Sequence, residues 1–136
     1  MRVLLFYGPE FWFRTHSKVI ESAPDDDREC RVENAVVAFV HAEPKDEGDA
    51  SGVETRLVKN VKWLAGKFGS KSAVLHYFSH LGSELAPPEF TRGVLDRAAE
   101  RLRSVGFRVE TTPFGHFCEW RLSVVGESLG KVWKEL

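Results

Sequence analysis

Two short segments combine residues that could carry chemistry with the signals of a turn. In the first, His80 and Ser83 follow the apolar run 72–78 and precede Pro87 and Pro88. Turns between strands and helices in α/β proteins present backbone amides and reactive side chains to a ligand at the sheet edge. The position of His80 therefore indicates a functional histidine rather than a structural one.

The second segment, residues 112–117, reads Thr-Pro-Phe-Gly-His-Phe and lies between two further strand-like runs. Pro113 presets φ, and Gly115 allows another part of the backbone to approach closely. Taken alone, this pattern predicts only an ordinary turn between strands.

Other reactive residues do not form a familiar signature. The chain has five scattered histidines: His16, His41, His76, His80 and His116. Their spacing matches no zinc motif, and no phosphate-binding glycine loop occurs, so we expect neither a metal nor a cofactor. Cys118 could act as a nucleophile with a neighbouring histidine. A cysteine is commonly just a small apolar residue, and we favour that interpretation.

Composition indicates one globular domain. The 136 residues are 43% hydrophobic and 29% charged, with a formal net charge of −1, so any RNA contact must come from a local patch. Two cysteines give no disulfide framework, and no apolar run or signal peptide suggests a membrane or export, which predicts a cytoplasmic protein. The absence of glutamine and the rarity of asparagine favour a thermophilic source.

Hydrophobic periodicity predicts alternating strands and helices. We expect strands over residues 1–7, 34–42, 72–78, 107–111 and 117–125, a strand or hairpin arm over 11–13, and helices over 53–68, 89–105 and 127–136. Gly8-Pro9 is expected to end the first strand. The fold class is then α/β: a single domain in which helices layer a β-sheet.

The pieces His80-Leu81-x-Ser83-Glu84-Leu85-Ala86-x-Pro88 and Pro113-Phe114-Gly115 resemble the amino-terminal editing domain of archaeal threonyl-tRNA synthetases. The resemblance runs from Met1 to about Lys131 and implies a D-aminoacyl-tRNA deacylase-like fold. It also implies proofreading, in which serine is hydrolysed from tRNA(Thr) with help from the 2′-hydroxyl of the terminal adenosine. Partners would be the 3′ end of that tRNA, a synthetase catalytic domain in cis or in trans, and a second copy in a homodimer.

The resemblance also assigns site residues. His80 would position the substrate, and the substrate-binding residues would be Ala42, Tyr77, Phe114, Gly115, Phe117 and Cys118. Two positions depart from the family pattern. Cys118 stands where the family has a lysine, and Lys131 stands where it often has a glutamate on the final helix. Either Lys131 supplies the missing cation as a catalytic residue, or it is a solvated lysine favoured by the helix dipole.

Several alternatives stay open from the sequence. The chain is either a complete small protein or a domain excised from a longer synthetase. A stand-alone D-aminoacyl-tRNA deacylase would share the fold, and so would a non-catalytic module that binds a small molecule or a partner. The arginines of the helix over 89–105 alternate with acids, which favours a solvated face over an RNA-binding one.

Overall fold

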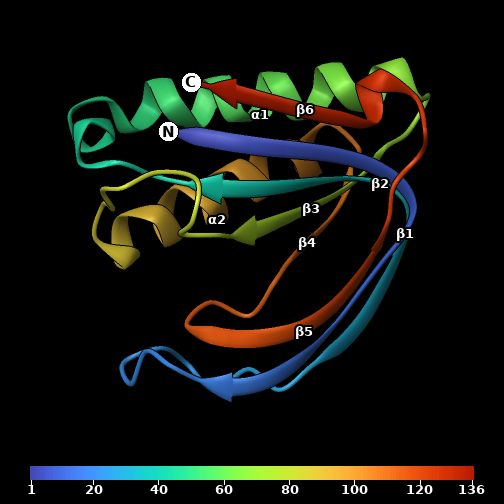
Figure 1. Ribbon diagram of the computed structural model, residues 1–136. Helices are drawn as coiled ribbons and strands as arrows, with labels where there is room; N and C mark the ends of the chain where they lie inside the picture. The colour runs from blue at the N-terminus through green and yellow to red at the C-terminus, as the bar shows by residue number, and fades with distance from the viewer.

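The computed structural model describes all 136 residues, which form a six-stranded sheet and two α-helices (Figure 1). The elements in chain order are β1 (Arg2–Lys18), β2 (Glu29–His41), the 3₁₀ turn η1 (Pro44–Asp49), α1 (Ala50–Lys67), β3 (Ser72–Tyr77), α2 (Pro88–Ser104), β4 (Arg108–Thr111), β5 (His116–Ser123), the 3₁₀ turn η2 (Ser128–Gly130) and β6 (Lys131–Glu135). The predicted class, one α/β domain with helices layered on a sheet, is confirmed.

The sheet is mixed, with strand order β4-β3-β2-β1-β5, and β6 also pairs with β1. β2, β3 and β4 are parallel neighbours, and α1 and α2 provide the crossovers that parallel pairing requires. β1 is antiparallel to β2, β5 and β6. β5 and β6 share one edge of β1 because each pairs with a different half of that strand.

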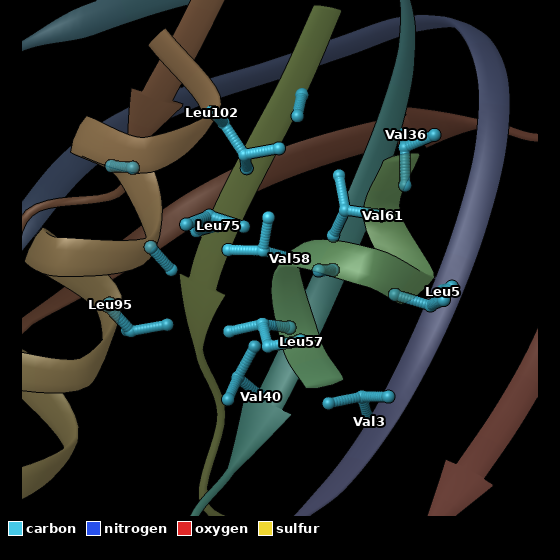
Figure 2. Close-up of a cluster of buried hydrophobic side chains, with 14 of the residues drawn as sticks. Val3, Leu5, Val36, Val40, Leu57, Val58, Val61, Leu75, Leu95 and Leu102 are labelled. Carbon is cyan, nitrogen blue, oxygen red and sulfur yellow. The ribbon is translucent and has the colours of Figure 1, made fainter. Parts of the chain in front are cut away.

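Both helices cover the same face of the sheet and build the larger core with it. Figure 2 shows how α1 contributes Leu57 and Val61 and how α2 contributes Leu95 and Leu102 to the core between the helices and the sheet. These positions recur at helical spacing, which is why the sequence predicts both helices to within a few residues of their bounds. Neither helix combines the length and apolarity that crossing a membrane would need.

β1 is one long, bent strand, so the expectation that Gly8-Pro9 ends it is wrong. A Cβ atom at Gly8 would collide with the backbone carbonyl of Ser123, so glycine is what lets the end of β5 approach here. Phe6 and Phe11 both lie against the smaller core although they are five residues apart. Side-chain alternation must therefore break between them, opposite Asn34, whose φ is +49°.

The C-terminal segment also corrects the sequence-based expectation. Residues 127–136 do not form a helix; a short 3₁₀ turn is followed by β6, which pairs with residues 2–6 of β1. β5 covers β1 only from Glu10 onward, so the first half of β1 would otherwise expose an unpaired edge. This long-range pairing outweighs the helical preference of an isolated ten-residue segment, which is marginal by itself.

The face of the sheet without helices is concave. β1, β2 and β5 curl below the rest of the sheet (Figure 1), and a second, aromatic core that includes Phe11, Phe13 and Phe39 lines the inside of the curl. The C-terminal end of β3 and the turn after β4 open onto this concave side.

Candidate functional site

A cavity of about 250 Å³ opens on the concave side of the sheet. Four segments line it: the loop after β1, the end of β3 with the residues that follow, the turn between β4 and β5, and β5 itself. The volume lies below the range of about 300–1,000 Å³ that holds drug-sized ligands. It therefore suits an amino acid with part of a sugar rather than a large cofactor.

Most of the site residues named from the sequence meet in this cavity. His80, Tyr77, Gly115, Phe117 and Cys118 all line it. The two predicted turns, far apart in the sequence, thus form opposite parts of one site.

Neither Phe114 nor Ala42 lines the cavity. The Phe114 ring packs edge-to-face on Tyr77, with 5.8 Å between ring centroids. Ala42 is buried at the end of β2, and its carbonyl accepts a hydrogen bond from the Ala86 amide at 3.0 Å. Both residues support lining residues or the loop beside them.

Lys131 is outside the cavity. It begins β6 opposite Phe6, and its exposed Nζ donates to the Val125 carbonyl at 3.3 Å. The final helix that would have carried Lys131 to the site does not exist. A catalytic role for Lys131 stays a prediction, and this position gives it no support.

The glycine of the second turn permits a close approach, as its sequence context predicts. Gly115 has a φ of +74°, and a Cβ atom there would lie 2.5 Å from that of Ala23. Its carbonyl accepts hydrogen bonds from the amides of Val19 and Ile20, at 2.8 and 3.0 Å. The turn is therefore fixed against the loop after β1, and both segments line the cavity together.

His76 is the main site residue that the sequence analysis missed. Its ring lies among Phe39, Phe78 and Trp120, with centroids 4.8 to 6.5 Å away, and its Nδ1 is 2.8 Å from Oγ1 of Thr112. Burial lowers the pKa of His76 from 6.5 to about 4, so the ring is neutral at pH 7. The sequence did offer a signal: His76 and Phe78 are two residues apart in a predicted strand, so their side chains should lie on the same face.

Two aromatic side chains stand at the cavity with large exposed surfaces. Phe117 is 63% exposed and Trp120 is 41% exposed. Exposed aromatic rings beside a binding cavity are suitable platforms for stacking a nucleobase.

The residues that line the cavity include no aspartate, glutamate, lysine or arginine. The polar groups present are three histidines, a serine, a threonine, the hydroxyl of Tyr77, the indole N–H of Trp120, a thiol and the backbone. The amides of Ser79 and His80 form no hydrogen bond within the chain. Free amides of this kind can donate to a carbonyl oxygen and to the negative charge that develops on it.

His116 has a defined tautomer. Its Nδ1 lies 2.9 Å from the Phe114 carbonyl, which can only accept, so Nδ1 carries a proton. Nε2 is then the atom available to a ligand when the ring is neutral.

Cys118 lacks the environment of a nucleophilic thiol. Burial raises the pKa of Cys118 above its usual value, and the positive charge of Arg28 opposes this only in part. The reactive form of cysteine is the thiolate, which this environment disfavours. The structure thus supports the interpretation of Cys118 as a small, mostly apolar wall residue.

We expect the Cys118→Ala variant to retain most of the wild-type hydrolytic activity, within about threefold. A small residue remains a small residue at the cavity wall, and no chemical step is assigned to the thiol. Single-turnover rates of the two proteins, measured on the same aminoacyl-tRNA, check this. Complete loss of activity in a folded Cys118→Ala protein would restore the thiol mechanism.

Three of the four arginines of α2 are engaged in ion pairs, and the fourth, Arg103, donates to the Val109 carbonyl. Arg97 and Arg101 reach the largely buried Glu54 of α1 at 2.7 and 3.4 Å, and Arg92 lies 3.7 Å from Asp96. This supports the interpretation of α2 as a salt-bridged face.

The sequence matches a known protein family over its whole length. The model of the archaea-specific editing domain of threonyl-tRNA synthetase matches residues 1–136. Similar curated proteins include the threonine–tRNA ligases of Hyperthermus butylicus, 33% identical, and Thermococcus onnurineus, 29% identical. Each match covers 97% of this chain but only 22% of the relative, so the chain spans about a fifth of these ligases.

A solved structure shows the same fold. The c-Myc DNA unwinding element binding protein superposes with a TM-score of 0.67, at 8% sequence identity, over 100% of this chain and 99% of its own. This likeness confirms the predicted D-aminoacyl-tRNA deacylase-like fold and carries nothing about activity.

Proposed function

The chain belongs to the family of archaea-specific editing domains of threonyl-tRNA synthetase, and we propose that it hydrolyses the ester that links serine to tRNA(Thr). Serine differs from threonine by one methyl group, and a binding site discriminates such a difference only by about 10- to 200-fold. A synthetase for threonine therefore needs a second, hydrolytic site that accepts the smaller amino acid.

The observation that carries the proposal is the cavity without charged side chains. An ester hydrolase that used its own carboxylate or lysine would need such a group at the reacting centre. The lining supplies none of the four charged residue types, but it offers two free amides and three histidines. This lining is suited to holding an ester while the activating group comes from the substrate.

In the proposed reaction, the 2′-hydroxyl of the terminal adenosine directs a water molecule at the ester carbonyl. The free amides of Ser79 and His80 hold the carbonyl oxygen and stabilise its negative charge in the transition state. When the tetrahedral intermediate collapses, the bond to the 3′-oxygen breaks, the proton given up by the water reaches that oxygen through the neighbouring 2′-hydroxyl, and serine and tRNA leave. Phe117 and Trp120 offer their exposed rings to the adenine.

The test is a substrate panel. We expect the protein to deacylate seryl-tRNA(Thr) faster than threonyl-tRNA(Thr) and to leave D-aminoacyl-tRNA nearly untouched. A preference for D-aminoacyl-tRNA would identify a D-aminoacyl-tRNA deacylase instead. Binding without hydrolysis of all three would identify a non-catalytic module.

We expect the His80→Ala variant to lose about tenfold in deacylation rate. The inferred role of His80 is to position the substrate, and a hydrogen bond of this kind is worth up to about 1.5 kcal/mol, which corresponds to about tenfold in rate. Single-turnover kinetics of His80→Ala beside His16→Ala, an exposed histidine outside the cavity, measure this. A fall to the uncatalysed rate in the folded His80 variant would make His80 an obligatory acid or base.

The proposed partners follow from the same role. The chain would act in the cytoplasm on the 3′ end of tRNA(Thr), beside a synthetase catalytic domain in cis or in trans. It would form a homodimer, because Trp63 and Trp133 remain 39% and 53% exposed. Light scattering at micromolar concentration would give the mass of two chains; the mass of one chain would refute the dimer.

A further inference from the structure

His41 is the one histidine of the chain that is fully buried, with 1% of its surface exposed. It ends β2 and lies beside the loop 78–87, which connects β3 to α2 and carries His80 into the cavity. Figure 1 shows this loop passing the tip of the β2 arrow. His41 itself does not line the cavity, so it touches the site only through this loop.

Both ring nitrogens of His41 bond to the backbone of the loop. The Leu81 amide donates to Nδ1 at 3.1 Å, and Nε2 lies 2.7 Å from the Glu84 carbonyl. An amide N–H can only donate and a carbonyl can only accept, so Nδ1 is bare and Nε2 carries the proton. The contacts therefore require one neutral tautomer of the ring.

Few other contacts hold the middle of the loop. Its two ends are fixed to β2, since the Phe78 amide donates to the Val40 carbonyl and the Ala86 amide to the Ala42 carbonyl. Between these ends, residues 83–85 are exposed. Apart from His41, the only side chain that forms a hydrogen bond with the loop between Phe78 and Ala86 is that of Arg2, whose Nη1 donates to the Leu81 carbonyl at 3.1 Å.

Gly82 shows how closely the loop approaches the ring. A Cβ atom at Gly82 would lie 3.2 Å from Nε2 of His41 and 3.3 Å from Nη1 of Arg2. Both distances are shorter than ordinary van der Waals contact, so with a larger residue at position 82 either the loop or the side chains beneath it must shift by a few tenths of an ångström. The loop therefore packs closely on the His41 ring at this point.

We propose that His41 is a positioning residue of the deacylation site, which fixes the loop 79–85 and thereby the free amides of Ser79 and His80. This inference rests on the proposed function, because those amides matter only if they hold the ester. Displacing catalytic groups by about 1 Å can cost roughly 10²-fold in rate. A buried ring outside the cavity thus controls the geometry inside it.

The test is a double-mutant cycle on seryl-tRNA(Thr). His41→Phe keeps a ring of similar size and removes both hydrogen bonds, and we expect single-turnover deacylation to fall about 10- to 100-fold. His41→Gln keeps one acceptor and one donor and should lose less. In the His41→Phe/His80→Ala protein the loss should be smaller than the product of the two separate losses, because both act through one loop. Losses that multiply, or equal losses for Phe and Gln, would refute the positioning role.

Amide hydrogen exchange separates this inference from the proposed function. We expect the Leu81 amide to exchange faster in His41→Phe than in the wild type, while amides of β2 and β3 keep their protection. If His41→Phe does not fold, Gly82→Ala crowds the His41 ring from the loop side and should slow deacylation. Unchanged Leu81 exchange would refute the inference, whereas a wild type inactive on seryl-tRNA(Thr) would refute the proposed function alone.

Discussion

Seryl-tRNA(Thr) whose terminal adenosine lacks the 2′-hydroxyl should be hydrolysed at least about 10²-fold more slowly than the natural substrate. The cavity lining contains no carboxylate that could take a proton from water and no ammonium or guanidinium that could replace the hydroxyl. Not every histidine of the lining could activate water in place of the missing hydroxyl, since His76 is hydrogen-bonded to Thr112 and lies among aromatic rings. The substrate's own hydroxyl is therefore expected to carry the largest single effect.

The measurement compares two tRNAs that differ only in the terminal nucleoside, both charged with serine on the 3′-hydroxyl. Competition binding with the uncharged forms should give similar affinities, so that the difference lies in the chemical step. The His80→Ala protein should show the same sensitivity to the missing hydroxyl as the wild type. Equal rates on the two substrates would instead assign water activation to the protein, with His80 or His116 as the first residues to test.

The local elements were predictable because their signals are local. α1, α2 and β3 each bury apolar residues at a regular spacing, and the structure has them within a few residues of the predicted bounds. His80 was identified from its place in a turn just after a strand, whereas Gly115 was assigned to the site only through the family resemblance. Both are found in one cavity.

The errors arise from contacts between distant parts of the chain. β1 continues through Gly8-Pro9 because Ser123, more than a hundred residues later, packs against the glycine. β6 forms because the first half of β1 offers an edge, and no property of residues 131–135 alone reveals that edge. Lys131 was expected at the site only through a helix that the chain does not form.

Whether a strand residue faces the site also could not be predicted. His76 comes from β3 and Trp120 from β5, and they meet because each strand turns that residue to the concave face of the sheet. Ala42 does not line the cavity because it belongs to the larger core on the helix side of the sheet. Predicting which residues face the site requires the order of the strands in the sheet, and the pattern of a single sequence does not give that order.

We expect His76 to make the protein less stable in acid. Burial lowers the pKa of His76 to about 4 in the folded state, whereas the unfolded chain has the ordinary value of 6.5. Below pH 6.5 the unfolded state binds a proton that the folded state does not, so the free energy of unfolding decreases as the pH is lowered. The loss accumulates between pH 6.5 and pH 4, reaches about 2 to 3 kcal/mol, and stops once both states are protonated.

Other groups titrate in the same range, so the His76 contribution is the difference between two proteins. His76→Phe places a non-titrating ring among Phe39, Phe78 and Trp120, and its urea midpoint should fall less between pH 7 and pH 4 than that of the wild type. His16→Gln, which changes an exposed histidine, should match the wild type throughout. If His76→Phe and wild type lose the same stability, the His76 ring is protonated in the folded protein. The description of His76 as a neutral ring among aromatic side chains of the cavity would then be wrong.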